Sequence, residues 1–255
     1  MTSWKRPSRA WPGPSATRCG WRARPCPPPR ALCDHAQALH QGRAVTGRPL
    51  VAILDYGIGN LHSAQKGFEH AGADARLTAD RGLIKAADGV VLPGVGAFAP
   101  CMAALGRTGL DAAAVDAVQS GRPFMGICVG MQVLFAGSDE APGVSGLGVF
   151  DRMVRWIPGP VKRPQMQWNV LQPSRDHPML DGLDNPVWAY FVHSLAPEMA
   201  DASDVVATCD YGGPVVAAVA RHNVWAAQFH PEKSSEVGLQ ILANFVTASA
   251  PAASV

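Results

Sequence analysis

The 255-residue sequence is poor in several kinds of residue and segment, and each shortage excludes a class of protein. It has no apolar run of 18 residues, so we expect no membrane-spanning helix, and no apolar run follows the first charges as a secretory signal requires. Charged residues make up only 16% and hydrophobic residues 47%, a balance that favours folding for most of the chain. Only three of the six cysteines lie beyond residue 48, which suggests a reducing compartment, so we expect a cytoplasmic protein.

Acidic side chains are nearly missing from residues 1–48, which hold nine Lys or Arg and a single acid, Asp34. The remaining 207 residues hold 13 of the 22 basic and 19 of the 20 acidic side chains, a net charge of −6. A chain-wide basic field is therefore excluded for this larger part, and we expect neither nucleic acid nor a membrane as its partner. Seven prolines and the lack of any periodicity predict that residues 1–48 are disordered and that a folded domain covers residues 49–250.

Three interpretations of residues 1–48 remain open. The Arg-rich, acid-poor composition suits an organellar transit peptide, although its prolines would break the amphipathic helix that such peptides need. The same charge suits a basic arm for nucleic acid or a membrane surface. The third is an upstream stretch included because the start codon was placed too early. We favour this third interpretation because the folded pattern starts abruptly at Pro49.

From residue 50 onward, short apolar runs alternate with helical patterns. We predict strands at 50–56, 73–78, 89–94 and 123–128, with helices at 61–72, at 98–120 and from 129 onward. This alternation predicts an α/β single domain with a central, mostly parallel sheet flanked by helices. Later strand-like segments at 187–194, 205–211, 215–220 and 224–230 are closely spaced, which indicates antiparallel or mixed pairing before a final helix at 235–249.

One cysteine directly follows a predicted strand and is enclosed by glycines. The segment Gly126-Ile127-Cys128-Val129-Gly130 ends an apolar run and begins a helical pattern. Glycine on either side lets backbones cross closely, as at the nucleophile elbow of hydrolases, and a helix start favours thiolate over thiol. The alternative is a buried cysteine that packs as a small hydrophobe, which is usual for an isolated cysteine. The flanking glycines favour Cys128 as a nucleophile.

A histidine followed by a carboxylate supplies the groups that such a nucleophile needs. In Gln228-Phe229-His230-Pro231-Glu232, His230 ends an apolar run and Glu232 lies two residues later. A cysteine nucleophile needs a base, and the base needs a third group that holds its imidazole in one tautomer. This motif alone fits a surface histidine equally well, but its occurrence together with Cys128 favours a catalytic triad.

Gly94, Val95 and Gly96 follow the third predicted strand. Glycines there free backbone N–H groups to face an anion, which suits an oxyanion hole at the carboxyl edge of a parallel sheet. An ordinary turn remains the alternative, whereas a phosphate loop would need a Lys and a Ser or Thr that are missing. The six histidines beyond residue 48 form no ligand-spaced cluster, so we expect no metal and no cofactor.

Several motifs, in this order along the chain, carry a family resemblance. The sequence reads DYGIGN, PGVGAF, GICVGMQ, Trp168-Asn169, FVHS and QFHPEKS. Together they resemble the class I (triad-type) glutamine amidotransferases, and within these the glutaminase subunits of imidazole glycerol phosphate synthases. The resemblance covers about residues 50–247. It implies a flavodoxin-like amidotransferase fold and a place in histidine biosynthesis.

The resemblance also implies roles for single residues. Cys128 would attack the side-chain amide carbon of glutamine, His230 would protonate the departing ammonia, and Glu232 would orient His230. Water would then hydrolyse the glutamyl thioester. The oxyanion and the substrate would be held by Gly94, Val95, Gly96, Val129, Gln132, His193 and Ser194.

A partner is implied as well. The ammonia would pass to a cyclase subunit, a (β/α)₈ barrel, in a heterodimer that acts on a phosphorylated aminoimidazole-type nucleotide precursor. The chain departs from the family pattern Lys-Val-Pro-His-Met-Gly-Trp-Asn, because Gln165 and Gln167 replace the histidine and the glycine. That region of the family faces the cyclase, so these replacements bear on coupling. Leu195 stands where an aromatic residue is usual.

Two other functions compete with this hypothesis. One is the amidotransferase of another pathway, such as anthranilate or guanylate synthesis, against which DYGIGN and PGVGAF argue. The other is a non-catalytic binding module with a decayed site. The presence of Cys128, His230 and Glu232 argues against a decayed site.

Overall fold

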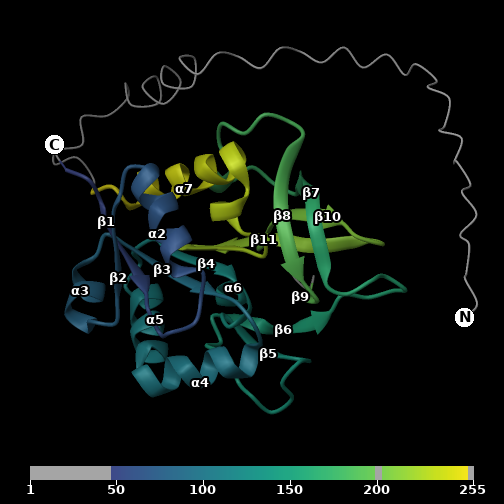
Figure 1. Ribbon diagram of the computed structural model, residues 1–255, viewed down its shortest axis with the longest axis horizontal. Coiled ribbons are helices and arrows are strands. Elements are labelled where there is room, and N and C mark those ends of the chain that lie inside the picture. Colours follow the sequence, from purple (N-terminus) through teal and green to yellow (C-terminus); the bar gives the residue numbers. More distant parts are fainter. Residues whose placement is uncertain (1–46, 199–202, 252–255) are drawn as a thin grey trace, which may run out of the picture. The chain divides into compact units, whose positions relative to one another are not determined.

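The computed structural model describes residues 47–198 and 203–251 (Figure 1). Our predictions for residues 1–46 lie outside this part of the chain. The described residues form one sheet of nine strands and a second sheet of three. The large sheet has the strand order β2–β1–β3–β4–β12–β11–β10–β7–β8, and the small sheet the order β5–β6–β9.

Five neighbouring strands of the large sheet pair in parallel. These are β2 (Asp74–Thr78), β1 (Leu50–Leu54), β3 (Gly89–Gly94), β4 (Phe124–Cys128) and β12 (Val224–Ala227). The four strands inside this group, β1, β3, β4 and β12, are apolar on both faces because helices cover both sides, whereas the edge strand β2 carries Asp74 and Arg76. The predicted α/β domain with a sheet flanked by helices is confirmed.

The helices pack in two layers. Helices α2 (Leu61–His70) and α7 (Ser235–Ser249) contact each other on one face of the sheet, and α4 (Phe98–Thr108) and α5 (Leu110–Gln119) lie on the other face (Figure 1). Gly109 separates α4 from α5 in a left-handed conformation, with φ 67°, that glycine adopts without strain. None of the helices in the described part of the chain is long and apolar enough to cross a membrane.

The remaining strands of the large sheet pair antiparallel. They are β11 (Pro214–Arg221), β10 (Val205–Asp210), β7 (Gln165–Pro173) and β8 (Val187–His193). The small sheet joins β5 (Phe135–Ser138), β6 (Phe150–Trp156) and β9 (Leu195–Pro197). The antiparallel or mixed pairing predicted for the second half is therefore confirmed.

The sequence patterns failed at several elements, among them the short strands β5 and β9. The helix predicted from residue 129 onward is the single turn α6 (Val129–Gln132), because Phe135–Ser138 pair with β6 instead of continuing the helix. Helix α3 (Arg81–Ala86) and strand β7 were not predicted. The segment Gln165–Val170 alternates polar and apolar residues as a strand does, but its apolar residues Met166 and Trp168 are exposed and Gln165 is buried, the reverse of the usual pattern.

Candidate active site

Cys128 is the last residue of β4 and precedes α6 directly. Its backbone has φ 55° and ψ −113°, a conformation that residues other than glycine rarely adopt. A Cβ atom added at Gly130 would lie 1.8 Å from the carbonyl oxygen of Leu92, and one added at Gly126 would lie 2.9 Å from the carbonyl oxygen of Gly130. The two glycines are therefore required by the close approach of β3, β4 and α6, and Cys128 sits on a strained strand-to-helix turn.

His230 and Glu232 form a buried pair next to Cys128. His230 Nδ1 lies 2.8 Å from Glu232 Oε1, and the two side chains are 3% and 2% exposed. Burial alone would lower the pKa of His230, but hydrogen bonds to the side chains of Cys128 and Glu232 outweigh it and raise the pKa to about 10. The carboxylate accepts from Nδ1, which leaves the other ring nitrogen for the thiol. The structure thus brings the three residues of the predicted triad together.

The main chain around His230 is held by strand β8. The His230 N–H donates to the carbonyl oxygen of Tyr190 at 3.1 Å. The Ser234 hydroxyl donates to the His230 carbonyl oxygen at 2.7 Å and accepts from the Tyr190 N–H at 3.0 Å. Ser234 is fully buried. Sequence reasoning missed this support, although Ser234 lies in the QFHPEKS motif.

The glycine-rich loop after β3 lies against the elbow. Gly94 is the last residue of β3 and pairs in register with Cys128. A Cβ atom at Gly94 would lie 2.6 Å from the Gly130 nitrogen and 3.0 Å from the Val129 carbonyl carbon. Val95 is half-buried and Gly96, with φ 85°, is exposed. The backbone N–H groups predicted to hold an oxyanion therefore belong to segments that are adjacent to the sulfur.

Two buried glutamines connect the elbow to strand β9. The Gln132 side-chain amide donates to Gln228 Oε1 at 3.0 Å and to the Leu195 carbonyl oxygen at 3.2 Å. Gln228 in turn lies 3.8 Å from the Cys128 sulfur through its Nε2 and is fully buried. Sequence reasoning did not select Gln228, whose only signal was its place two residues before His230.

His193 contacts the same Leu195 carbonyl oxygen as Gln132 does. Its ring nitrogens lie 2.8 Å from the Leu195 carbonyl oxygen and 3.0 Å from the side-chain amide of Gln165. Burial lowers the pKa of His193 to about 4, in spite of the hydrogen bond to Leu195. The ring therefore stays neutral at pH 7 and anchors the backbone of β9. The Ser194 carbonyl oxygen accepts from the Ile157 N–H at 3.0 Å, so this segment is fixed on both sides.

The family model described as "Glutamine amidotransferase class-I" matches residues 52–248. The chain belongs to the class I glutamine amidotransferase family. The match spans every strand and helix that carries the geometry above except the first residues of β1 and the last residue of α7.

Within this family, the chain is similar to curated proteins of one kind. The chain is 45% identical over 195 residues to a protein of Symbiobacterium thermophilum and 48% identical over 203 residues to one of Syntrophotalea carbinolica. Both are described as "Imidazole glycerol phosphate synthase subunit HisH". The matches cover 76% and 77% of this chain and 92% and 98% of the relatives.

Solved structures support the fold. One is described as PurLQS from Thermotoga maritima, and another as a glutamine amidotransferase. Each superposes with a TM-score of 0.63 at 18% identity, over 78% of this chain and 98% of the other. At this identity the likeness shows the amidotransferase fold alone.

The two departures from the amidotransferase pattern differ in their surroundings. Gln165 is fully buried, pairs with His193 across β7 and β8, and lies 3.7 Å from the Cys209 sulfur. Gln167 is exposed. Of the two replacements, only Gln167 lies on the surface, and Gln165 points into the protein toward the His193 network. Leu195 is buried, and its backbone carbonyl makes the contacts described above.

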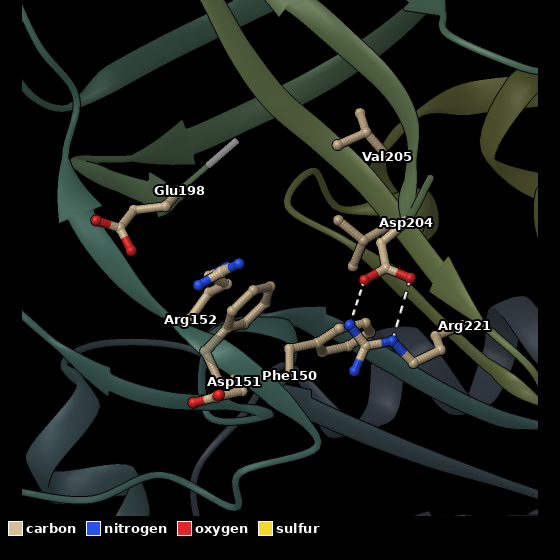
Figure 2. A pocket seen from close by; sticks show the side chains of 9 residues that line it. Phe150, Asp151, Arg152, Glu198, Asp204, Val205 and Arg221 are labelled. Atoms are coloured by element: carbon tan, nitrogen blue, oxygen red, sulfur yellow. Dashed lines mark hydrogen bonds and ion pairs between the residues drawn. The ribbon is translucent and has the colours of Figure 1, made fainter. Parts of the chain in front are cut away.

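The triad is closed off from solvent. Cys128 is 4% exposed and His230 is 2% exposed. A cavity of about 110 Å³ lies instead beside β6, β10 and β11, where the Arg221–Asp204 ion pair faces it (Figure 2). A second cavity, of about 260 Å³, lies beside Trp156 and Pro214. Neither of these two cavities is lined by a triad residue.

Proposed function

We propose that this chain is the glutaminase subunit of an imidazole glycerol phosphate synthase. It hydrolyses glutamine to glutamate and ammonia, and the ammonia passes to a cyclase subunit, a (β/α)₈ barrel, for histidine biosynthesis. The observation that carries the proposal is the buried Cys128–His230–Glu232 constellation on a strained elbow, in a chain similar along most of its length to HisH subunits. The amidotransferase domain spans residues 49–250, and residues 1–48 take no part in the chemistry.

Each residue of the triad has one task. Cys128 transfers its proton to His230, and its sulfur forms a bond to the amide carbon of glutamine. His230 then gives the proton to the leaving nitrogen, the C–N bond breaks, and ammonia departs from a glutamyl thioester. Glu232 keeps the imidazole oriented and stabilises its charged form. His230 next takes a proton from water, which attacks the thioester and releases glutamate and the thiol.

Backbone N–H groups of Gly94, Val95 and Val129 stabilise the tetrahedral oxyanion, and Gly96 contacts the substrate. Their place beside the sulfur supports this role. Gln132 and the segment His193–Ser194 complete the glutamine site. Because the ring of His193 and the amide of Gln132 are already engaged in buried hydrogen bonds, His193 contributes through the backbone that it anchors.

Activity depends on the partner, and the closed triad supports this. An exposed apolar surface is available for docking: Met166 (62% exposed), Trp168 (45%) and Trp188 (46%) share one face of the β7–β8 pair. Exposed patches of this kind mark protein interfaces. On the same face Trp168 contacts Tyr190, with ring centroids 6.0 Å apart, and the Tyr190 backbone holds His230. A chain of two contacts, from Trp168 to Tyr190 and from Tyr190 to His230, therefore connects the docking face to the catalytic base.

The deciding experiment is a coupled assay with a co-purified cyclase. We expect slow glutamate release by the chain alone and a large increase when the cyclase and its nucleotide ligand are added. Robust hydrolysis by the isolated chain that the cyclase leaves unchanged would contradict the proposal. Growth of a histidine auxotroph on this gene separates the proposal from an amidotransferase of anthranilate or guanylate synthesis.

The docking face has its own test. Trp168→Ala and Trp188→Ala should weaken cyclase binding at least tenfold, since large aromatic residues at the centre of an interface contribute roughly 2 kcal/mol or more. Trp156→Ala is the matched control, because Trp156 is 46% exposed but lies on β6 in the small sheet. Equal weakening by all three variants in a titration would contradict this placement of the interface.

A further inference from the structure

Two buried side chains outside the triad donate hydrogen bonds to the loop that precedes the elbow. The Tyr56 hydroxyl donates to the carbonyl oxygen of Pro93 at 2.7 Å. The Cys101 thiol donates to the carbonyl oxygen of Val95 at 3.4 Å. Tyr56 follows β1 and is 4% exposed, and Cys101 lies in α4 and is fully buried. The two donors therefore reach one short loop from two different elements.

These contacts fix the peptides on both sides of the Val95 N–H. A peptide unit is planar and trans, so its carbonyl and its N–H point in opposite directions. Holding the Pro93 carbonyl sets the direction of the Gly94 N–H, and holding the Val95 carbonyl sets that of the Gly96 N–H. The peptide that joins Gly94 to Val95 lies between these two fixed units. The orientation of the proposed oxyanion donors thus depends on both side chains.

Packing shows how tightly the loop is confined. A Cβ atom added at Gly94 would lie 2.9 Å from the Tyr56 hydroxyl oxygen on one side and 2.6 Å from the Gly130 nitrogen on the other. Tyr56 and Cys101 also interact with each other, and burial raises the pKa of both. Both groups therefore keep their protons at neutral pH and remain donors.

We propose that Tyr56 and Cys101 are positioning residues that hold the loop Pro93–Gly96 so that its N–H groups face the oxyanion. This inference rests on the proposed glutaminase function. Donors that are oriented in advance lower the barrier to the tetrahedral intermediate without binding the ground-state substrate more tightly. Losing a positioning residue should therefore lower kcat and leave KM nearly unchanged.

The test uses the complex with the cyclase at saturating nucleotide ligand. Tyr56→Phe removes only the hydroxyl, and we expect kcat for glutamine hydrolysis to fall about tenfold with KM within about twofold. Tyr211→Phe is the matched control, because its hydroxyl also donates to a backbone carbonyl, that of Lys162, at 2.7 Å but far along the chain from the loop. Cys101→Ala should lower kcat less, since a thiol is a weak donor, and Cys101→Ser should restore part of the loss.

Alkylation separates positioning from damage to the fold. Iodoacetamide reacts by attack of the Cys128 sulfur on the carbon that bears iodine, forming a C–S bond and releasing iodide, and no oxyanion develops. Peptide mapping should show the same Cys128 alkylation rate in Tyr56→Phe and the wild type. Unchanged kcat in both Tyr56→Phe and Cys101→Ala, a raised kcat, or equal losses of kcat and alkylation rate would each overturn the assignment. If the wild-type complex hydrolyses no glutamine, the proposed function fails and this inference falls with it.

Discussion

Cys128 and His230, the proposed nucleophile and its base, are held by different means in two regions of the large sheet. In the parallel region, Cys128 is fixed by its own strained backbone and by glycines whose contacts leave no room for a Cβ atom. At the border with the antiparallel region, the His230 N–H donates to the Tyr190 carbonyl oxygen, and the His230 carbonyl oxygen accepts from the Ser234 hydroxyl. At the elbow, a single added atom clashes with several backbone segments together, whereas a substitution near His230 removes one hydrogen bond and leaves the others in place.

This contrast explains why the parallel region tolerates little change. The elbow joins β3, β4 and α6 within one short stretch, so a substitution there displaces several backbones together. The support of His230 is spread over strand β8 and the start of α7, which are far apart in the sequence. Substitutions in the two regions should therefore differ in the size of their effects.

The largest effect should come from the nucleophile itself. Cys128→Ser keeps the shape of the elbow but replaces the thiol by an alcohol that His230 activates poorly, so glutamine hydrolysis should fall by at least about 10³-fold. The same complex should still use added ammonium salts for the cyclase reaction, which serves as the control. Retention of glutamine-dependent synthesis above one-tenth of the wild-type rate would exclude Cys128 as the nucleophile.

The steric requirement at the elbow is tested by a pair of identical exchanges. Gly130→Ala places a Cβ atom 1.8 Å from the Leu92 carbonyl oxygen, so we expect the free energy of unfolding to fall by about 3 kcal/mol and activity to be lost. Gly106→Ala in α4 meets its first neighbouring atom only at 3.9 Å, so it should raise stability by about 0.5 to 1 kcal/mol. Denaturant unfolding measures both. Opposite changes in the free energy of unfolding would support a steric requirement specific to the elbow, and a loss of stability in both variants would contradict it.

His193 gives the antiparallel region a specific dependence on pH. Its pKa of about 4 in the folded protein lies below the ordinary value of 6.5, so the unfolded chain binds the proton first as pH falls. The contribution of His193 to the free energy of unfolding is therefore highest above pH 6.5. It falls by up to about 3 kcal/mol as the pH is lowered from 6.5 to 4.

Unfolding titrations between pH 7 and 4 check this prediction. The wild type should lose more stability over this interval than His193→Gln, and the difference isolates this residue from the carboxylates. His70→Gln on the exposed end of α2 controls for the exchange itself. Parallel curves for the wild type and His193→Gln would show that the ring does not stay neutral.

The smallest effect should come from Ser234, one of several groups that hold His230. Ser234→Ala removes the hydroxyl that links the His230 carbonyl to the Tyr190 N–H, so we expect a loss of about 1 to 2 kcal/mol in stability and about tenfold in kcat. Ser249→Ala is matched, because Ser249 is also buried and donates to a carbonyl, that of Phe245, at 2.9 Å. It should lower stability similarly and leave kcat unchanged. A loss of kcat in both variants would contradict the specific support of His230.

The sequence predicted the strands of the parallel region and most of those of the antiparallel region, but it missed β7 and the end of α6 for a physical reason. Strands such as β1, β3 and β4 are buried on both faces, so their apolar runs and the helices between them are visible locally. Strand β7 alternates polar and apolar residues, but its apolar residues Met166 and Trp168 are exposed, and only its pairing with β8 fixes its place in the sheet. Likewise, α6 ends early only because β5 pairs with β6. Local periodicity does not show which strands pair.

The same division applies to the site. Cys128, His230 and Glu232 were found from motifs, because reactive groups must follow strand ends at particular spacings. Motifs did not reveal three other features: the contact of Gln228 with the Cys128 sulfur, the burial of Gln165, and the hydrogen bond from Tyr56 to the loop. Each depends on how elements that are separate in the sequence pack together.

The sequence by itself determined the family and the fold class and singled out Cys128, His230 and Glu232 as the proposed triad, since these follow from local strand–helix alternation and from short motifs that chemistry constrains. Only the tertiary structure decided that the triad is buried, that Gln165 faces His193, and that Tyr56 and Cys101 donate hydrogen bonds to the glycine loop. The contacts of Gln165 with His193 and of Tyr56 with Pro93 join residues 28 and 37 positions apart, and a hydrogen bond exists only where packing brings donor and acceptor within about 3 Å.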